Sequence, residues 1–202
     1  MELSQIFENT LYFLALVNPA SKILFLSTRQ PPYTQREMTL LSLRSSLVAW
    51  LILVILTAIG NFLLVSVFNV EIYSLSVAGG FILFMVGLNA VQKGRFFEET
   101  KEMQNISEVS VVPLAAPLIA GPGAMTAAIS YASIHGILTT VICITIALLV
   151  NLAFMLASSK IGWILQKMGI IGPLIRITGL VVTAVAMQMM FSGCASWITK
   201  TL

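Results

Sequence analysis

Six long apolar runs constrain what this chain can fold into more than any other feature of its sequence. A helix needs about 20 predominantly apolar residues to cross the hydrocarbon core of a bilayer. Charged residues make up only 9% of the sequence, against about 25% in water-soluble domains. The sequence therefore predicts an all-α integral membrane protein, a multi-pass protein whose first partner is the lipid bilayer. The six runs cover approximately residues 7–28, 45–68, 72–92, 110–133, 136–157 and 173–197.

Basic residues are concentrated in the loops on one side of these six spans. The positive-inside rule places short loops rich in Lys and Arg in the cytoplasm. We therefore expect both termini to be extracytoplasmic. The net charge of +3 then reports topology and not nucleic-acid binding, because the basic residues are spread over three short loops. These inner loops carry Arg29, Arg36, Arg44, Lys93, Arg95, Lys101, Lys160, Lys167 and Arg176, and the outer side carries Lys200.

A polar segment at residues 93–109 divides the chain into two halves of three spans each. It predicts a cytoplasmic connecting loop between a first three-helix repeat, 1–92, and a second, 110–202. Because three is an odd number, homologous halves would be inverted relative to one another in the membrane. The sequence therefore predicts six transmembrane helices arranged as two inverted three-helix repeats. The alignment sets Pro19 over Pro122, Gly80 over Gly179 and Asn89 over Gln188, with one amide in each second span, Asn61 and Asn151.

The stretch PLIAGPGAMTAA, residues 117–128, interrupts the fourth apolar run with two prolines and two glycines, and Asn18-Pro19 interrupts the first run. Non-helical backbone at membrane depth is tolerated only where it is buried in protein or lines a wet cavity, and inverted-repeat transporters place such breaks at the midplane. The N–H groups exposed at a break favour an anion, and the exposed carbonyls favour a cation. Broken first and fourth helices thus predict a central site for a small zwitterion. The alternative is a pair of proline kinks that only shape packing.

Four motifs in this chain resemble the MarC/SnatA family of bacterial and archaeal inner-membrane proteins. The resemblance covers nearly the whole chain, and the proline–glycine motif of the second half is its most specific part. It implies a fold of six helices in two inverted triplets. It also implies cation-coupled import of small neutral amino acids such as glycine and alanine, as in members of the SnatA type. The motifs are NPASKILFLS (18–27), VAGGFILFM (77–85), VVPLAAPLIAGPGAMTAAI (111–129) and RITGLVVTAVAMQMM (176–190).

The resemblance implies that the two broken segments hold the substrate near the midplane. The predicted function is therefore a secondary transporter that works by alternating access, with a proton or sodium ion as the candidate coupling cation. A passive channel or exporter of small polar solutes, which could share the inverted repeat, is the alternative. The predicted substrate-binding residues are Asn18, Pro19, Ala20, Ser21, Gly121, Pro122, Gly123, Ala124 and Thr126.

The chain departs from the family pattern in the first motif and in the third span. Lys22 takes a polar position, Leu24 replaces a second proline, and Asn89 stands where an acidic residue is often found. Two roles are open for Lys22: its ammonium extends to the membrane interface, or it folds back to the break where a coupling cation would bind. Intramembrane amides either bond between helices or line the cavity. The candidate cavity-lining residues are Lys22, Asn61, Asn89, Asn151 and Gln188.

Enzymatic function is not expected from this sequence. An intramembrane enzyme needs a nucleophile with a base, or a set of metal ligands. The chain has one His and no Asp, and no acid falls deep in a predicted span. There is also no glycine-rich, lysine-containing nucleotide-binding motif. We therefore expect no catalytic residues, no metal site and no cofactor.

Overall fold

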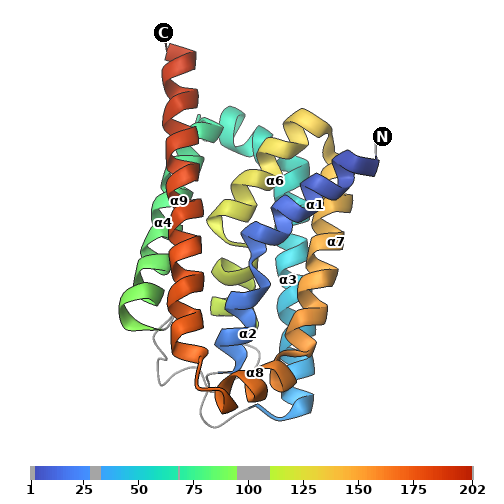
Figure 1. The fold of residues 1–202 in the computed structure, drawn as a ribbon. Helices are drawn as coiled ribbons and strands as arrows, with labels where there is room; N and C mark the ends of the chain where they lie inside the picture. Colours follow the sequence, from blue (N-terminus) through green and yellow to red (C-terminus); the bar gives the residue numbers. More distant parts are fainter. Residues whose placement is uncertain (1–2, 28–32, 68, 95–109, 202) are drawn as a thin grey trace.

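The structure is a computed structural model that describes residues 3–27, 33–67, 69–94 and 110–201. All regular structure in these residues is helical, without a strand. Most helices run along one axis of the molecule, and α8 lies across one end of it (Figure 1). The elements are α1 (Leu3–Val17), α2 (Pro19–Ser27), α3 (Gln35–Asn61), the π-helical η1 (Phe62–Val67), α4 (Ile72–Lys93), the π-helical η2 (Ser110–Ile119), α6 (Pro122–His135), α7 (Ile137–Leu156), α8 (Ser158–Lys167) and α9 (Ile171–Thr201).

Five helical segments among the described residues are long and apolar enough to cross a membrane. The first of them passes through both α1 and α2. The remaining predicted run, at 110–133, is occupied by η2 and α6, which are too short to qualify singly. The protein is thus an integral membrane protein with several apolar helices, and the sixth span stays a prediction. The five segments are Ser4–Ser27, Gln35–Gly60, Ile72–Lys93, Ile137–Leu156 and Ile171–Lys200.

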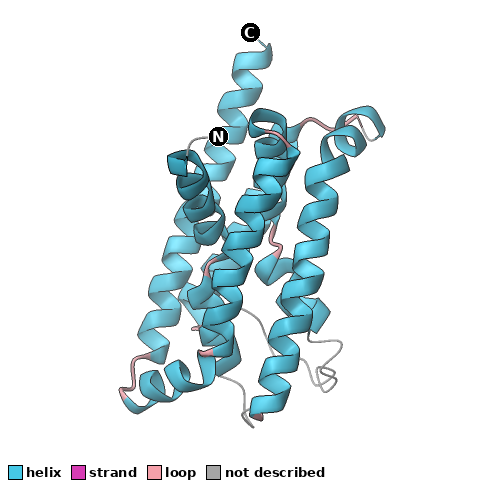
Figure 2. Ribbon diagram, turned by 90° about the vertical axis from the view of Figure 1, so that its right-hand side faces the viewer, coloured by secondary structure: helices cyan, strands magenta, loops and turns pink. Residues whose placement is uncertain are grey.

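Both ends of the chain lie at the same end of the molecule, which we call the terminal end (Figures 1 and 2). Helix α8 lies at the opposite end, where α4 also finishes. The expectation that the two termini share one side is consistent with this arrangement.

Helix α3 begins earlier than the apolar pattern indicates, at Gln35 and not near residue 45. A capping box starts it: the Thr34 hydroxyl accepts from the Glu37 N–H at 3.3 Å, and a Glu37 carboxylate oxygen accepts from the Thr34 N–H at 2.8 Å. Such a box satisfies two backbone donors that the first turn leaves unpaired. Arg36 and Arg44 therefore lie in a helix that extends beyond the apolar run.

The region after the fifth predicted span is helical and not a loop. Helix α8 exposes Trp163 and Ile164 and carries Lys160 and Lys167. It packs against the end of α2, because a Cβ atom added to Gly162 would lie 2.3 Å from the Ser27 Cβ atom. This short amphipathic helix has too few apolar residues to register as a span.

Helices α4 and α9 run side by side and are held close by small residues (Figure 1). A Cβ atom added to Gly87 would lie 2.9 Å from the Gly179 carbonyl oxygen, and one added to Gly179 would lie 2.9 Å from the Gly87 carbonyl oxygen. Glycine at these positions lets the two backbones approach, as small residues do in membrane helix pairs.

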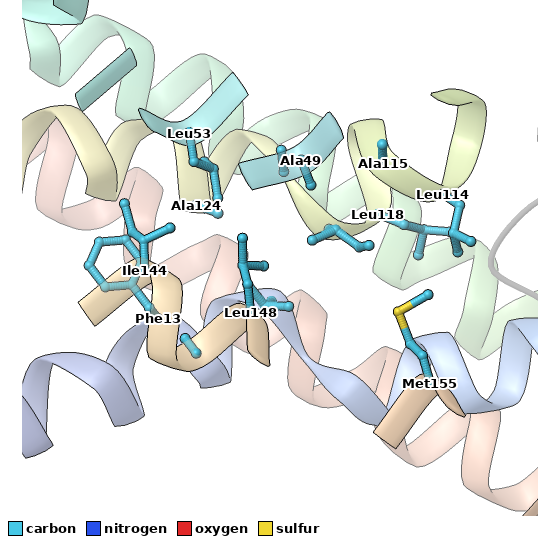
Figure 3. Close-up of a cluster of buried hydrophobic side chains, with 14 of the residues drawn as sticks. Phe13, Ala49, Leu53, Leu114, Ala115, Leu118, Ala124, Ile144, Leu148 and Met155 are labelled. Atoms are coloured by element: carbon cyan, nitrogen blue, oxygen red, sulfur yellow. The ribbon is translucent and has the colours of Figure 1, made fainter. Parts of the chain in front are cut away.

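Two clusters of buried side chains form the interior. The larger joins α1, α3, η2, α6 and α7, with Phe13, Leu53, Ile144 and Leu148 among its members (Figure 3). The smaller joins α2, α4 and α9 through Leu24, Ala90, Ile175 and Val182. Large apolar side chains also cover the outward faces of α3, α4, α7 and α9, which is the surface that a bilayer requires.

Candidate functional site

The first helix break lies at Asn18, between α1 and α2. Asn18 has a φ of +52°, the left-handed region that Asn tolerates better than most residues. Pro19 then begins α2 with no backbone N–H to leave unpaired. The Ser21 N–H donates to the Asn18 carbonyl at 3.1 Å. In a continuous helix it would donate to the Val17 carbonyl, so the break releases that carbonyl.

Lys22 supplies the released carbonyl with a donor. Its Nζ atom donates to the Val17 carbonyl and lies 3.2 Å from Ser21 Oγ. The side chain is only 1% exposed. Two roles were open for Lys22. In the structure its side chain folds back to the break and does not extend to the membrane interface.

The second break lies between η2 and α6, at Ala120 and Gly121. The Ala120 N–H donates to the Ala115 carbonyl at 2.8 Å, which ends the π-helical pattern. Gly121 caps α6 in an extended conformation and offers no side-chain cap. The first bond of α6 runs from the Met125 N–H to the Gly121 carbonyl at 2.9 Å. The N–H groups of Gly123 and Ala124 therefore lie in the first turn of α6 and have no acceptor within the helix.

The start of α6 lies against three other helices at Gly123. A Cβ atom added there would lie 3.0 Å from Met189 Sδ, 3.4 Å from Leu16 Cδ2 and 3.6 Å from Leu83 Cδ2. Leu16 belongs to the last turn of α1, directly before the first break. The fold therefore brings the second break to the final turn of the first half-helix.

A cavity of about 620 Å³ extends from Gly123 toward the terminal end of the molecule. Its volume is within the range of about 300–1,000 Å³ typical of small-molecule sites. It passes between α1, α4, α6 and α9 and reaches the residues that begin α4 and finish α6. Its lining includes Tyr12, Leu16, Glu71, Ser76, Gly123, Thr126, Ser130, Tyr131, Gln188, Met189 and Ser196.

Thr126 gives this cavity a buried polar group with spare bonding capacity. Its side chain is 5% exposed, and its Oγ1 atom has no hydrogen-bond partner among the described residues. Buried hydroxyls are nearly always paired. Thr126 lies one turn after Gly123, on the same face of α6, so the hydroxyl and the first-turn N–H groups are near one another.

The cavity brings together three of the predicted residues: Gly123, Thr126 and Gln188. The others lie elsewhere. Asn18 and Pro19 are half-buried, Ala20 is exposed, Ser21, Gly121 and Ala124 are buried, and Asn89 is half-buried on α4. Asn151 is fully buried on α7, where its amide nitrogen lies 3.2 Å from Met155 Sδ. The side chains of Asn61 and Pro122 lie outside the described part of the structure.

Two features of the cavity were not anticipated from the sequence. Tyr12 and Tyr131 form a stacked pair on its wall, with ring centroids 5.1 Å apart. At its mouth, Lys200 Nζ lies 2.5 Å from a Glu71 carboxylate oxygen. Both pairs join residues far apart in the chain, and uniformly apolar helices carry no periodicity that would indicate which residues face the cavity.

Comparison with known proteins agrees with the helical membrane architecture. The chain is similar to a UPF0056 membrane protein of Pyrococcus horikoshii, with 34% identity over 99% of this chain and 98% of the relative. It is also similar to the UPF0056 membrane protein YvbG of Bacillus subtilis, with 28% identity over 89% of each chain. No solved structure matches it. The sequence profile described as "MarC family integral membrane protein" matches residues 3–198. This chain belongs to the MarC family of integral membrane proteins.

Proposed function

We propose that this chain is a secondary transporter of small neutral amino acids in the cell inner membrane, working by alternating access. The observation that carries the proposal is the start of α6: Gly123, whose N–H group lies in the first turn, and Thr126, whose hydroxyl has no partner among the described residues, both line the cavity. A helix N-terminus with free N–H groups attracts a carboxylate. The substrate carboxylate therefore binds at the Gly123 N–H group, with Thr126 as an additional donor.

The inner end of the cavity suits a substrate with a small side chain. Leu16, Leu83 and Met189 surround Gly123 closely, so a large side chain beside the carboxylate would meet them. Ser130 and Gln188 also line the cavity, and their side-chain oxygen atoms can accept from the substrate ammonium group. Glycine and alanine fit this combination of a zwitterion and little bulk.

The contact between α4 and α9 supports the inverted repeat. Val77, Gly80, Gly87 and Gly94 are among the residues of α4 and its cap that approach α9, as are Tyr73, Ser76, Ala90 and Val91. The alignment of Gly80 with Gly179 is an offset of 99 residues. The same offset takes Val77, Gly80, Gly87 and Gly94 to four positions of α9 that approach α4: Arg176, Gly179, Ala186 and Gly193. The two third spans therefore use equivalent faces, as a two-fold axis in the membrane plane requires.

The two ends of the molecule differ in a way that suits alternating access. The cavity extends toward the terminal end. Toward the other end, Leu24, Ala90 and Val182 are packed together, and Arg176 donates to the carbonyls of Val91 and Gln92. Among the described residues, this arrangement fits a carrier that is open toward the terminal end and packed at the other. With both termini extracytoplasmic, as the basic residues favour, it corresponds to an outward-facing state.

Ligand binding to the purified protein tests the proposal. A thermal-shift screen against the common amino acids should show stabilisation by glycine and alanine, because a ligand of the folded state raises its apparent stability. Bulky and charged amino acids serve as controls. Stabilisation by none of the small neutral amino acids would contradict the proposal, and flux of many unrelated solutes without saturation would favour the channel or exporter.

A further inference from the structure

The first helix break contains an amino group that belongs to the chain itself, that of Lys22. The Val17 carbonyl loses its helical donor because the Ser21 N–H donates to Asn18. Lys22 Nζ occupies that place, bonded to the Val17 carbonyl and 3.2 Å from Ser21 Oγ. The partners of the ammonium are thus a released backbone carbonyl and a hydroxyl oxygen.

No carboxylate compensates this ammonium within the described residues. An ion pair among these residues joins Glu71 to Lys200, at the terminal end. Lys22 is 1% exposed, and an ionised side chain at membrane depth is costly unless polar groups surround it. What faces it is the carbonyl end of α1, which carries the negative end of the helix dipole. The ammonium is therefore placed to neutralise that end.

Oxygen atoms of this kind are ligands for sodium in other carriers. In inverted-repeat transporters, unwound carbonyls and half-helix C-terminal ends coordinate the coupling cation. We propose that Lys22 is a built-in cation that occupies the place of a dissociable sodium ion at the first break. One consequence of this inference rests on the proposed function: transport by this chain does not depend on sodium. A proton gradient or substrate exchange then drives it.

Two variants and one matched control test the proposal. Lys22→Met ends one atom short of the Nζ position and leaves it vacant. Lys22→Gln also ends one atom short and carries a neutral amide, with one oxygen atom and one NH₂ group. Lys200→Met removes one positive charge at a site that is 59% exposed and away from the break. The melting temperature of each purified protein is measured in sodium, lithium, potassium and N-methyl-D-glucamine chloride at equal ionic strength.

The parent and Lys200→Met should melt at the same temperature in all four salts. Lys22→Met and Lys22→Gln should melt lower in N-methyl-D-glucamine and recover about 3 °C or more in sodium, because a cation that binds the folded state stabilises it. Sodium-dependent stability of the parent would overturn the proposal, and so would variants indifferent to the cation. Failure of both variants to fold in every salt would also overturn it, since no free cation could then replace the ammonium.

This measurement separates the inference from the proposed function. Melting temperature reports occupancy of the cation site without any amino acid present. If glycine and alanine fail to bind while Lys22→Met gains a sodium dependence, the site assignment stands and the transport assignment falls. If they bind and the variants are indifferent to cations, the reverse holds. Glycine affinity measured in the same salts adds the functional arm: it should depend on sodium in Lys22→Met and not in the parent.

Discussion

At the scale of single residues, the two breaks agree with expectation more closely than the cavity does. The break at Asn18-Pro19 could be predicted because proline removes a helical donor. The structure adds that Asn18 has a φ of +52°, which Asn tolerates better than most residues. Thr126 and Gln188 line the cavity, and Asn89 does not. This difference depends on how four helices pack together. The sequence carries no signal for that, because each of these helices is apolar on all sides.

The Thr126 hydroxyl should contribute directly to substrate affinity. Thr126→Val keeps the shape of the side chain and removes the donor, so glycine affinity should fall about 10-fold to 100-fold, as expected for a lost hydrogen bond to a charged group. Isothermal titration of the purified protein measures this. Thr10→Val is the matched control, because Thr10 Oγ1 is also buried and has no partner among the described residues, but Thr10 does not line the cavity. Equal affinity loss in both variants would remove Thr126 from the site.

Gly123 should be required for transport and not for insertion into the membrane. The space of its missing side chain is bounded by Met189 at 3.0 Å and Leu16 at 3.4 Å. Gly123→Val therefore blocks the approach of a carboxylate to the backbone, and uptake should be abolished while the protein stays folded. Gly172→Val, where nothing lies within 4 Å of an added Cβ, is the control. Normal glycine affinity in Gly123→Val would show that the second break is only a kink.

At the scale of helices, the apolar runs indicate where the spans lie but miss the parts that face water. Helix α8 and the first turns of α3 escaped the pattern because they are amphipathic or polar, and a search for apolar runs detects neither. The sequence aligned Gly80 with Gly179 as equivalent positions of the two halves and did not predict that α4 and α9 pair closely. The structure adds that the two backbones approach one another at Gly87 and Gly179, and also at Gly80 and Gly193.

The α4–α9 contact should tolerate no side chain at Gly87. An added Cβ would lie 2.4 Å from Thr183 Oγ1 and 2.8 Å from the Thr183 backbone nitrogen, and the backbone cannot yield as a flexible side chain can. Gly87→Ala should cost about 1–3 kcal/mol through overpacking, which lowers the melting temperature by roughly 2–12 °C. Gly172→Ala should leave it unchanged. Similar melting temperatures for the two variants would show that the helices separate more easily than this contact implies.

At the scale of the whole molecule, the distribution of charge predicts the topology. The arrangement of the termini at one end is consistent with the prediction that they share a side, and the excess of basic residues in the other loops predicts that this side is extracytoplasmic. In a background without Cys143 and Cys194, a cysteine at Thr199 should react with an impermeant thiol reagent in intact cells, and one at Lys160 should react only after permeabilisation. The opposite pattern would reverse the orientation and make the cavity inward-facing.

Accumulation of glycine by the purified chain tests the central claim most directly. Proteoliposomes containing the parent protein are compared with those containing Gly123→Val and with empty liposomes, under proton and sodium gradients imposed separately and in exchange for preloaded alanine. The account predicts saturable glycine uptake by the parent. Under a proton gradient or in exchange, the internal glycine concentration should exceed the external one, and a sodium gradient should not increase uptake. Gly123→Val should show no uptake. Glycine flux that only equilibrates under every gradient and in exchange, or that survives in Gly123→Val, would contradict it.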